Sequence, residues 1–131
     1  MRYIYLAYPM TTAETTAAAM LELGQWFRKM KRYKVHEPVY ELFTEALAEK
    51  TIERLDQCSH IVADLSQTSH GVGFEVGYAF SKGKKVYIVA NLTERDKLSK
   101  FITSLFGDII YYKDGKDLIQ IFDSIISSKK L

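Results

Sequence analysis

Five apolar, strand-like runs alternate with five helical patterns along this chain, and this order restricts the fold more than any other feature of the sequence. Strands that alternate with helices pair in parallel, with the helices covering the sheet. The predicted strands are Tyr3–Tyr8, Tyr33–Val39, Ile61–Leu65, Val86–Ala90 and Ile109–Tyr112. The predicted helices run from a Thr11 or Thr12 cap to about Met30, over Tyr40–Gln57 with a break near Ala48–Lys50, over Gly71–Lys82, from a Thr93 cap to Gly107, and over Lys116–Ser128.

The third and fourth strands are nearly all apolar, which is typical of central strands buried on both faces. We therefore predict an α/β fold of the flavodoxin or Rossmann type. It is a three-layer sandwich in which helices cover both faces of a five-stranded parallel sheet with the order 2-1-3-4-5. The chain has 131 residues, the size of a single domain, so we expect one domain over residues 1–131.

Composition excludes several classes of function. The net charge of +2 is too small to indicate a nucleic-acid partner. The start of the chain has no secretion-signal pattern and no stretch is long enough to cross a bilayer, so we expect a cytoplasmic protein without a membrane partner. The single cysteine, Cys58, excludes an internal disulfide and a zinc site, and we expect it to be buried and structural. We expect no metal and no cofactor.

In such a sheet the ligand binds beyond the carboxyl ends of the strands, here between the first and third strands. Tyr8–Thr12, Ser66–Gly73, and Asn91 with Thr93 follow these ends, and Glu37 lies one strand further out. The second of these loops leads into a helix N-terminus, which favours anions. Its spacing, G-x-G-x-x-x-G, matches neither a Rossmann fingerprint nor a P-loop. The spacing alone is consistent with phosphate binding and equally with plain helix–sheet packing.

Glu75 lies about one turn inside this predicted helix, where its side chain can reach the pocket. Nearness to the helix N-terminus should favour its ionised form. A glutamate in a first turn can also do no more than complement the helix dipole, and the residue pattern leaves both interpretations open.

Three segments resemble the nucleoside 2-deoxyribosyltransferase superfamily, and most closely its branch of 2-deoxynucleoside 5-monophosphate N-glycosidases. They are the opening strand IYLAYPM, the signature S-x-G-V-G-x-E-x-G over Ser69–Gly77, and the later strand KKVYIV. The resemblance covers most of the chain, and the signature is its most specific part.

The resemblance implies hydrolysis of the N-glycosidic bond of a nucleoside 5-monophosphate, with Glu75 as the nucleophile. It implies that Ser69 contacts the phosphate and that Tyr5 lines the sugar and base pocket. It also implies a homodimer or larger homo-oligomer in which Ser99 reaches the phosphate of the neighbouring subunit. The remaining substrate-binding positions that we predict are Tyr8, Pro9, Met10, Gly71 and Gly73.

The chain also departs from the family pattern. The family's second carboxylate, an aspartate, falls on Thr51, and an arginine of the monophosphate-specific branch is replaced by Thr11. The carboxyls that could replace the aspartate are those of Glu37, Glu49, Glu53 and Asp64. Tyr8 could stack on a base or pack on the first helix, and His70 could touch the ligand or face solvent.

Three alternative functions therefore stay open. One is deoxyribosyl transfer between nucleobases, and another is glycohydrolysis of a larger nucleotide such as NAD. The third is a nucleotide-binding or sensing domain with weak catalysis or none, which the threonine at position 51 favours.

Overall fold

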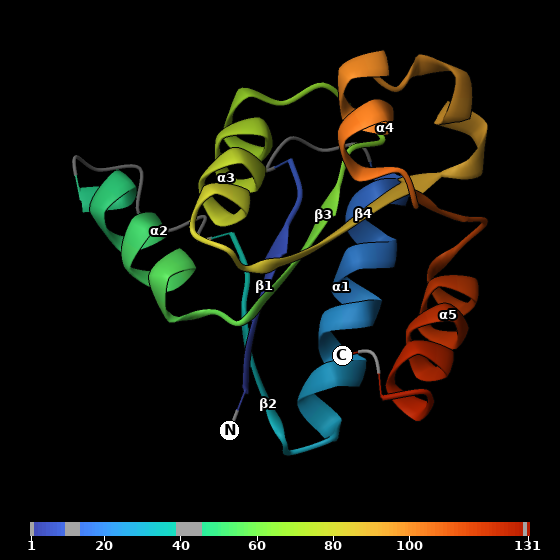
Figure 1. Cartoon of the computed structure of the whole chain (residues 1–131). Coiled ribbons are helices and arrows are strands. Elements are labelled where there is room, and N and C mark those ends of the chain that lie inside the picture. The colour runs from blue at the N-terminus through green and yellow to red at the C-terminus, as the bar shows by residue number, and fades with distance from the viewer. Residues whose placement is uncertain (1, 10–13, 39–45, 130) are drawn as a thin grey trace.

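All five predicted strand–helix repeats form in the computed structural model, which describes residues 2–9, 14–38, 46–129 and 131 (Figure 1). The strands are β1 (Arg2–Ala7), β2 (Tyr33–His36), β3 (His60–Asp64), β4 (Lys85–Asn91) and β5 (Ile110–Tyr112). The helices are α1 (Glu14–Lys29), α2 (Ala46–Gln57), α3 (His70–Ser81), α4 (Lys100–Phe106) and α5 (Gly115–Ser127), with a 3₁₀ helix, η1 (Leu92–Lys97), before α4. Every strand pairing is parallel and the order is β2-β1-β3-β4-β5, which confirms the predicted fold class.

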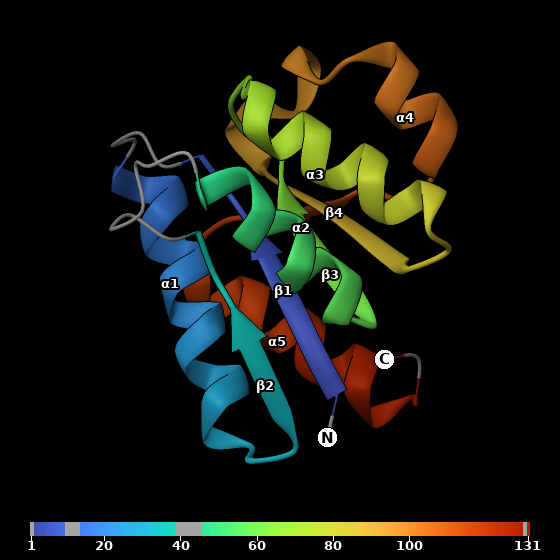
Figure 2. The same ribbon diagram turned by 90° about the vertical axis from the view of Figure 1, so that its left-hand side faces the viewer.

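The helices form two layers on opposite faces of this sheet (Figure 2). Alternate strand residues point to opposite faces. Ile4 and Val62 belong to the core that includes Phe27 of α1 and Phe122 of α5. Their neighbours along the strands belong to the second core, beneath α2 and α3, which consists of Tyr5, Ala7, Leu55, Cys58, Ile61, Ala63, Val72, Val76, Ala79 and Ile88. Cys58 is buried as predicted, and its Sγ lies 3.1 Å from the carbonyl oxygen of Leu55.

The segment after β4 differs from the prediction of one helix capped by Thr93. Asn91 is the cap, because its Oδ1 accepts the backbone N–H of Thr93 at 3.0 Å. After η1, Leu98 and Ser99 have extended backbone angles, so α4 begins separately. Gly107 ends α4 as predicted, with a φ of 65° that favours glycine.

The other boundaries differ less. The predicted break near Ala48–Lys50 does not occur, since α2 is continuous from Ala46 to Gln57. The predicted caps Thr11 and Thr12, and the junction predicted near Val39 and Tyr40, lie outside the described residues. In the described part of the chain, every helix is too short or too polar to span a bilayer.

Candidate active site

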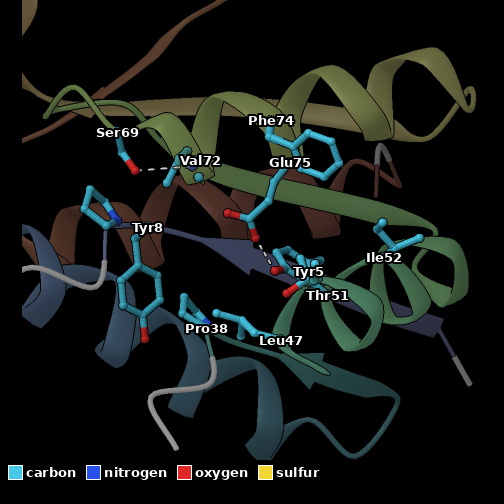
Figure 3. A pocket seen from close by; sticks show the side chains of 13 residues that line it. Tyr5, Tyr8, Pro38, Leu47, Thr51, Ile52, Ser69, Val72, Phe74 and Glu75 are labelled. Carbon is cyan, nitrogen blue, oxygen red and sulfur yellow. Dashed lines mark hydrogen bonds between the residues drawn. The ribbon is translucent and has the colours of Figure 1, made fainter. Parts of the chain in front are cut away.

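A cavity of about 480 Å³ opens between the carboxyl end of β1, the first turns of α3 and one side of α2 (Figure 3). This is the predicted position, at the switch point between the first and third strands. Six of the nine predicted site residues line it, namely Tyr5, Tyr8, Pro9, Ser69, Gly71 and Glu75. Gly73 and Ser99 line a neighbouring cavity instead, and Met10 lies outside the described residues.

Glu75 lies on the buried side of α3. The buried residues of this helix are Val72, Glu75, Val76 and Ala79, which recur at the spacing of one helix face. The carboxyl is therefore directed toward the sheet, and the residue is only 9% exposed. There the hydroxyl of Tyr5, on β1, donates a hydrogen bond to Glu75 Oε2 (Figure 3). A glutamate that only complemented the helix dipole would not need this buried position.

Burial controls the charge of this pair. It raises the pKa of Glu75 to about 7, although the hydrogen bond from Tyr5 acts in the opposite direction. The pKa of the Tyr5 hydroxyl is also raised, first by burial and then by the nearby Glu75 carboxylate. The expected preference of Glu75 for the ionised form is thus outweighed by desolvation. Near neutral pH the carboxyl exchanges between its two protonation states.

Thr51 occupies the α2 wall of the cavity together with Leu47, Ala48 and Ile52. Glu49 and Glu53, on the same helix, are exposed and do not line the cavity. Neither glutamate therefore replaces the family aspartate in this structure. The α2 wall presents the hydroxyl of Thr51 on the side of the cavity where Tyr5 and Glu75 meet (Figure 3).

Tyr8 packs on the first helix, as one of its two alternatives predicted, and its stacking on a base stays a prediction. Its ring lines the cavity, and it also belongs to the core formed with α1. The hydroxyl donates to Glu37 Oε1 at 3.4 Å, and the guanidinium of Arg28 donates to the other oxygen of Glu37. Glu37 therefore fixes the hydroxyl end of the Tyr8 ring by a hydrogen bond. Glu37 itself does not line the cavity.

The remaining predicted candidates point elsewhere. Asp64 is fully buried, but its carboxyl is bonded to Tyr112 on the α1 and α5 side of the sheet. His70 is exposed and does not line the cavity. Among the described residues, Glu75 is the only carboxylate that lines it. The described His, Cys, Asp and Glu side chains form no group that could hold a metal ion.

A smaller cavity of about 190 Å³ lies between α3 and the η1–α4 segment, next to the main one, and two serines line it. Ser69 lines both cavities, and its Oγ accepts the backbone N–H of Val72 at 3.3 Å, which caps α3. Ser99 lines the smaller cavity and caps α4 in the same way, accepting from the N–H of Phe101 at 3.2 Å. Because each oxygen accepts from its helix, each hydroxyl hydrogen can still be donated to a ligand.

The sequence did not identify the apolar part of the cavity wall. Leu47 and Ile52 have the same spacing as residues that face a core, and a residue pattern cannot distinguish the two positions. Phe74, 52% exposed at the cavity rim, gave no signal either. Lys97, which lines the smaller cavity and pairs with Glu94 at 3.0 Å, was also missed. Each was missed because no local feature marks it.

Known proteins share this sequence pattern and fold. Residues 4–104 match the family model described as Nucleoside 2-deoxyribosyltransferase. A curated protein of Thermofilum pendens, named "Putative 2'-deoxynucleoside 5'-phosphate N-hydrolase 1", is 30% identical over 81 residues. That match covers 60% of this chain and 57% of the relative, so the chain spans little more than half of the relative's length.

Three solved structures are also similar. A CMP N-glycosidase of Clostridium botulinum has a TM-score of 0.71 at 20% identity, covering 93% of this chain and 98% of that chain. A 2-desoxiribosyltransferase from Leishmania mexicana has a TM-score of 0.58 at 27% identity, and the match covers 69% of this chain and 65% of that chain. A 2-deoxyribosyltransferase of Bacillus psychrosaccharolyticus has a TM-score of 0.62 at 18% identity, and the match covers 89% of this chain and 90% of that chain. These similarities confirm the flavodoxin-like fold.

Proposed function

The chain belongs to the nucleoside 2-deoxyribosyltransferase family, and from this membership we propose that it hydrolyses the N-glycosidic bond of a (deoxy)nucleoside 5-monophosphate. The products are a free base and a sugar phosphate. The observation that carries the proposal is the buried carboxyl of Glu75, which meets the hydroxyl of Tyr5 inside the switch-point cavity. The name of the Thermofilum relative supports the monophosphate as substrate.

Glu75 acts as the nucleophile in this proposal. Its ionised carboxylate attacks the anomeric carbon, and the bonding electrons of the C–N bond leave with the base. The leaving base takes up a proton from solvent. Water then hydrolyses the glycosyl ester, which releases the sugar phosphate, restores the carboxylate and returns a proton to solvent. Tyr5 donates a hydrogen bond to the carboxylate and so holds it in one orientation before attack.

The phosphate is placed at the first turn of α3, beside Ser69. Free N–H groups at a helix N-terminus favour an anion, and the capping hydroxyl can donate to it. Lys97 lines the adjoining cavity, which Ser69 also lines, and adds a positive charge. These groups support a phosphorylated substrate over a free nucleoside.

A homodimer or larger assembly is part of the proposal. The large exposed apolar residues of α3 and α4 are Phe74, Phe80, Phe101 and Leu105, and Phe101 is 72% exposed. Ser99 begins the same helix as Phe101, so a partner subunit that covers α4 would bring its ligand close to Ser99. Light scattering at micromolar concentration should give the mass of a dimer or more, and a monomer would contradict the shared site.

Deoxyribosyl transfer is the second candidate. It follows the same first step, after which a second base, instead of water, attacks the glycosyl ester. The family description and the similarity to the Leishmania transferase favour it. The third candidate, nucleotide sensing without efficient catalysis, is favoured by Thr51 at the position of the family aspartate.

One assay separates these candidates. Nucleoside monophosphates and the matching nucleosides are incubated with the native protein, and released base is measured by chromatography, with and without a second base. Glu75→Gln, which keeps the shape and removes the charge, should abolish base release and leave nucleotide binding nearly intact. Glu53→Gln is the matched control, since Glu53 is exposed and outside the cavity. Full activity of Glu75→Gln would refute the assignment of the nucleophile.

A further inference from the structure

Asp64 is a buried carboxyl that the reaction described above does not use. It is the last residue of β3 and has no exposed surface. Along β3 it shares the face of Val62, toward α1 and α5, whereas Ala63 faces the side of α3. Its carboxyl therefore lies on the opposite side of the sheet from Glu75 and does not line the substrate cavity.

The carboxyl of Asp64 and the hydroxyl of Ser66 form a hydrogen-bond network at the ends of β3, β4 and β5. Its Oδ1 accepts the backbone N–H of Ser66 at 2.8 Å, and its Oδ2 accepts the hydroxyl of Tyr112, the last residue of β5. Ser66 Oγ in turn accepts the backbone N–H of Asn91, the last residue of β4, at 2.7 Å. The loop that leaves β3 is thus held at the end of β4 through Ser66, and Asp64, from which the loop starts, is held at the end of β5 through Tyr112.

This loop leads directly into the helix that carries Glu75. Leu65 continues the sheet through its N–H to the carbonyl of Val89 at 2.9 Å, and Ser69 caps α3. Tyr5, the partner of Glu75, is on β1 and is independent of the loop. The alignment of Glu75 with Tyr5 therefore depends on the position in which the loop holds the first turn of α3.

We propose that Asp64, together with Tyr112, is a positioning residue that holds the Leu65–Ser69 loop and thereby aligns Glu75 with Tyr5 and the substrate. The expected effect of Asp64 on kcat rests on the proposed function. A buried carboxyl carries a desolvation cost that an apolar side chain would avoid. The carboxyl accepts the Ser66 N–H with one oxygen and the Tyr112 hydroxyl with the other, which an apolar side chain of the same size cannot do.

Three variants test this role. Asp64→Ala removes both hydrogen bonds. Asp64→Asn keeps an acceptor for the Ser66 N–H, and its amide can donate to the oxygen of Tyr112, so it should rescue the loop. Phe122→Leu is the control, because it perturbs the same core, where Phe122 packs against Phe27 and Tyr87, without touching the loop.

The expected result is a selective loss of kcat. Small displacements of a reacting group are costly, so Asp64→Ala should lower kcat about 100-fold while KM changes little. Asp64→Asn should stay close to native, and Phe122→Leu should keep the native kcat per folded molecule. Should Asp64→Ala fail to fold, Tyr112→Phe removes one bond only and should give a smaller loss of kcat. A native kcat in Tyr112→Phe, or equal loss in Asp64→Ala and Phe122→Leu, would overturn the proposal.

Hydrogen exchange supplies a readout that does not need catalysis. In Asp64→Ala, or in Tyr112→Phe, backbone amides of residues 66–73 should exchange faster than in Phe122→Leu compared at equal stability. Unchanged exchange rates of these amides in both variants would refute the positioning role. If the native protein turns over no substrate, the proposed function fails, and the exchange pattern still decides whether Asp64 and Tyr112 hold the loop.

Discussion

Tyr5 and Glu75 are 70 positions apart in the chain, and the hydroxyl of one donates a hydrogen bond to the carboxyl of the other inside a single cavity. The pair brings together the first strand and the third helix, two elements that meet at the switch point of the sheet. Burial of this pair makes Glu75 a carboxyl with a pKa of about 7.

The rate should rise with pH through the neutral range, because only the ionised form of Glu75 is a nucleophile and its pKa is about 7. Tyr5→Phe removes the hydrogen bond that lowers this pKa, so the midpoint of the kcat/KM profile should move to higher pH. The profile is measured as kcat/KM from acid to alkaline pH, because this ratio reports the groups of the ligand-free enzyme. Tyr78→Phe is the control, since Tyr78 bonds to Asp56 at the surface. A midpoint that stays in place in Tyr5→Phe would show that another group titrates.

Folding stability should depend on the same group. The folded-state pKa of Glu75 is raised from an ordinary 4.5 to about 7, so the folded protein binds the proton more tightly than the unfolded chain. This contribution is fully present below pH 4.5 and is lost as pH rises through 7, amounting to about 3 kcal/mol. Urea unfolding of native protein and Glu75→Gln at pH 5 and pH 8 measures it. The native protein should lose more stability than the variant, and equal losses would contradict the raised pKa.

An aspartate in place of Thr51 on α2 should accelerate base release if the native protein is slow. Thr51 lines the cavity, and the resemblance to the family predicts an aspartate at its position, so Thr51→Asp supplies a group for proton transfer. General acid–base assistance contributes about 10²–10⁴-fold, so even partial restoration is measurable as base release. Lys50→Asp, on the exposed side of α2, is the control. If neither native protein nor Thr51→Asp turns over any substrate, while calorimetry detects nucleotide binding, the sensing function is favoured.

Ser99 should distinguish phosphorylated from unphosphorylated ligands. Ser99→Ala should weaken binding of a monophosphate more than that of its nucleoside, because a hydrogen bond to a charged group contributes about 1.5–3 kcal/mol. The variant also loses the α4 cap, which costs about 1 kcal/mol of stability.

Ser99→Asp separates the two effects, since aspartate caps the helix and repels phosphate. Binding is measured by calorimetry, with Ser104→Ala, on the exposed side of α4, as the control. Equal loss for both ligands in Ser99→Ala would show that Ser99 does not contact phosphate.

The parts of the fold that the sequence predicted are those with local causes. Apolar runs and helical spacing depend on neighbouring residues, so all five repeats were recognised and the sheet order followed from their alternation. The cap after β4 was misplaced because Asn91 and Thr93 both carry capping side chains, and the backbone bend decides which oxygen meets a free N–H. The apolar wall that Leu47 and Ile52 form was not predicted either, because the residue pattern does not show whether such side chains face a core or a cavity.

By itself, the sequence determined the parallel α/β architecture and placed Glu75 and Ser69 beside one cavity, since both lie in one continuous motif after the third strand. Only the tertiary structure decided which way Asp64 points. A central strand covered on both faces has no polar alternation from which its sides can be told apart. The tertiary structure also decided the partner of Glu75 and the charge of its carboxyl. Both depend on contacts and burial contributed by residues distant in the chain, and no local pattern contains them.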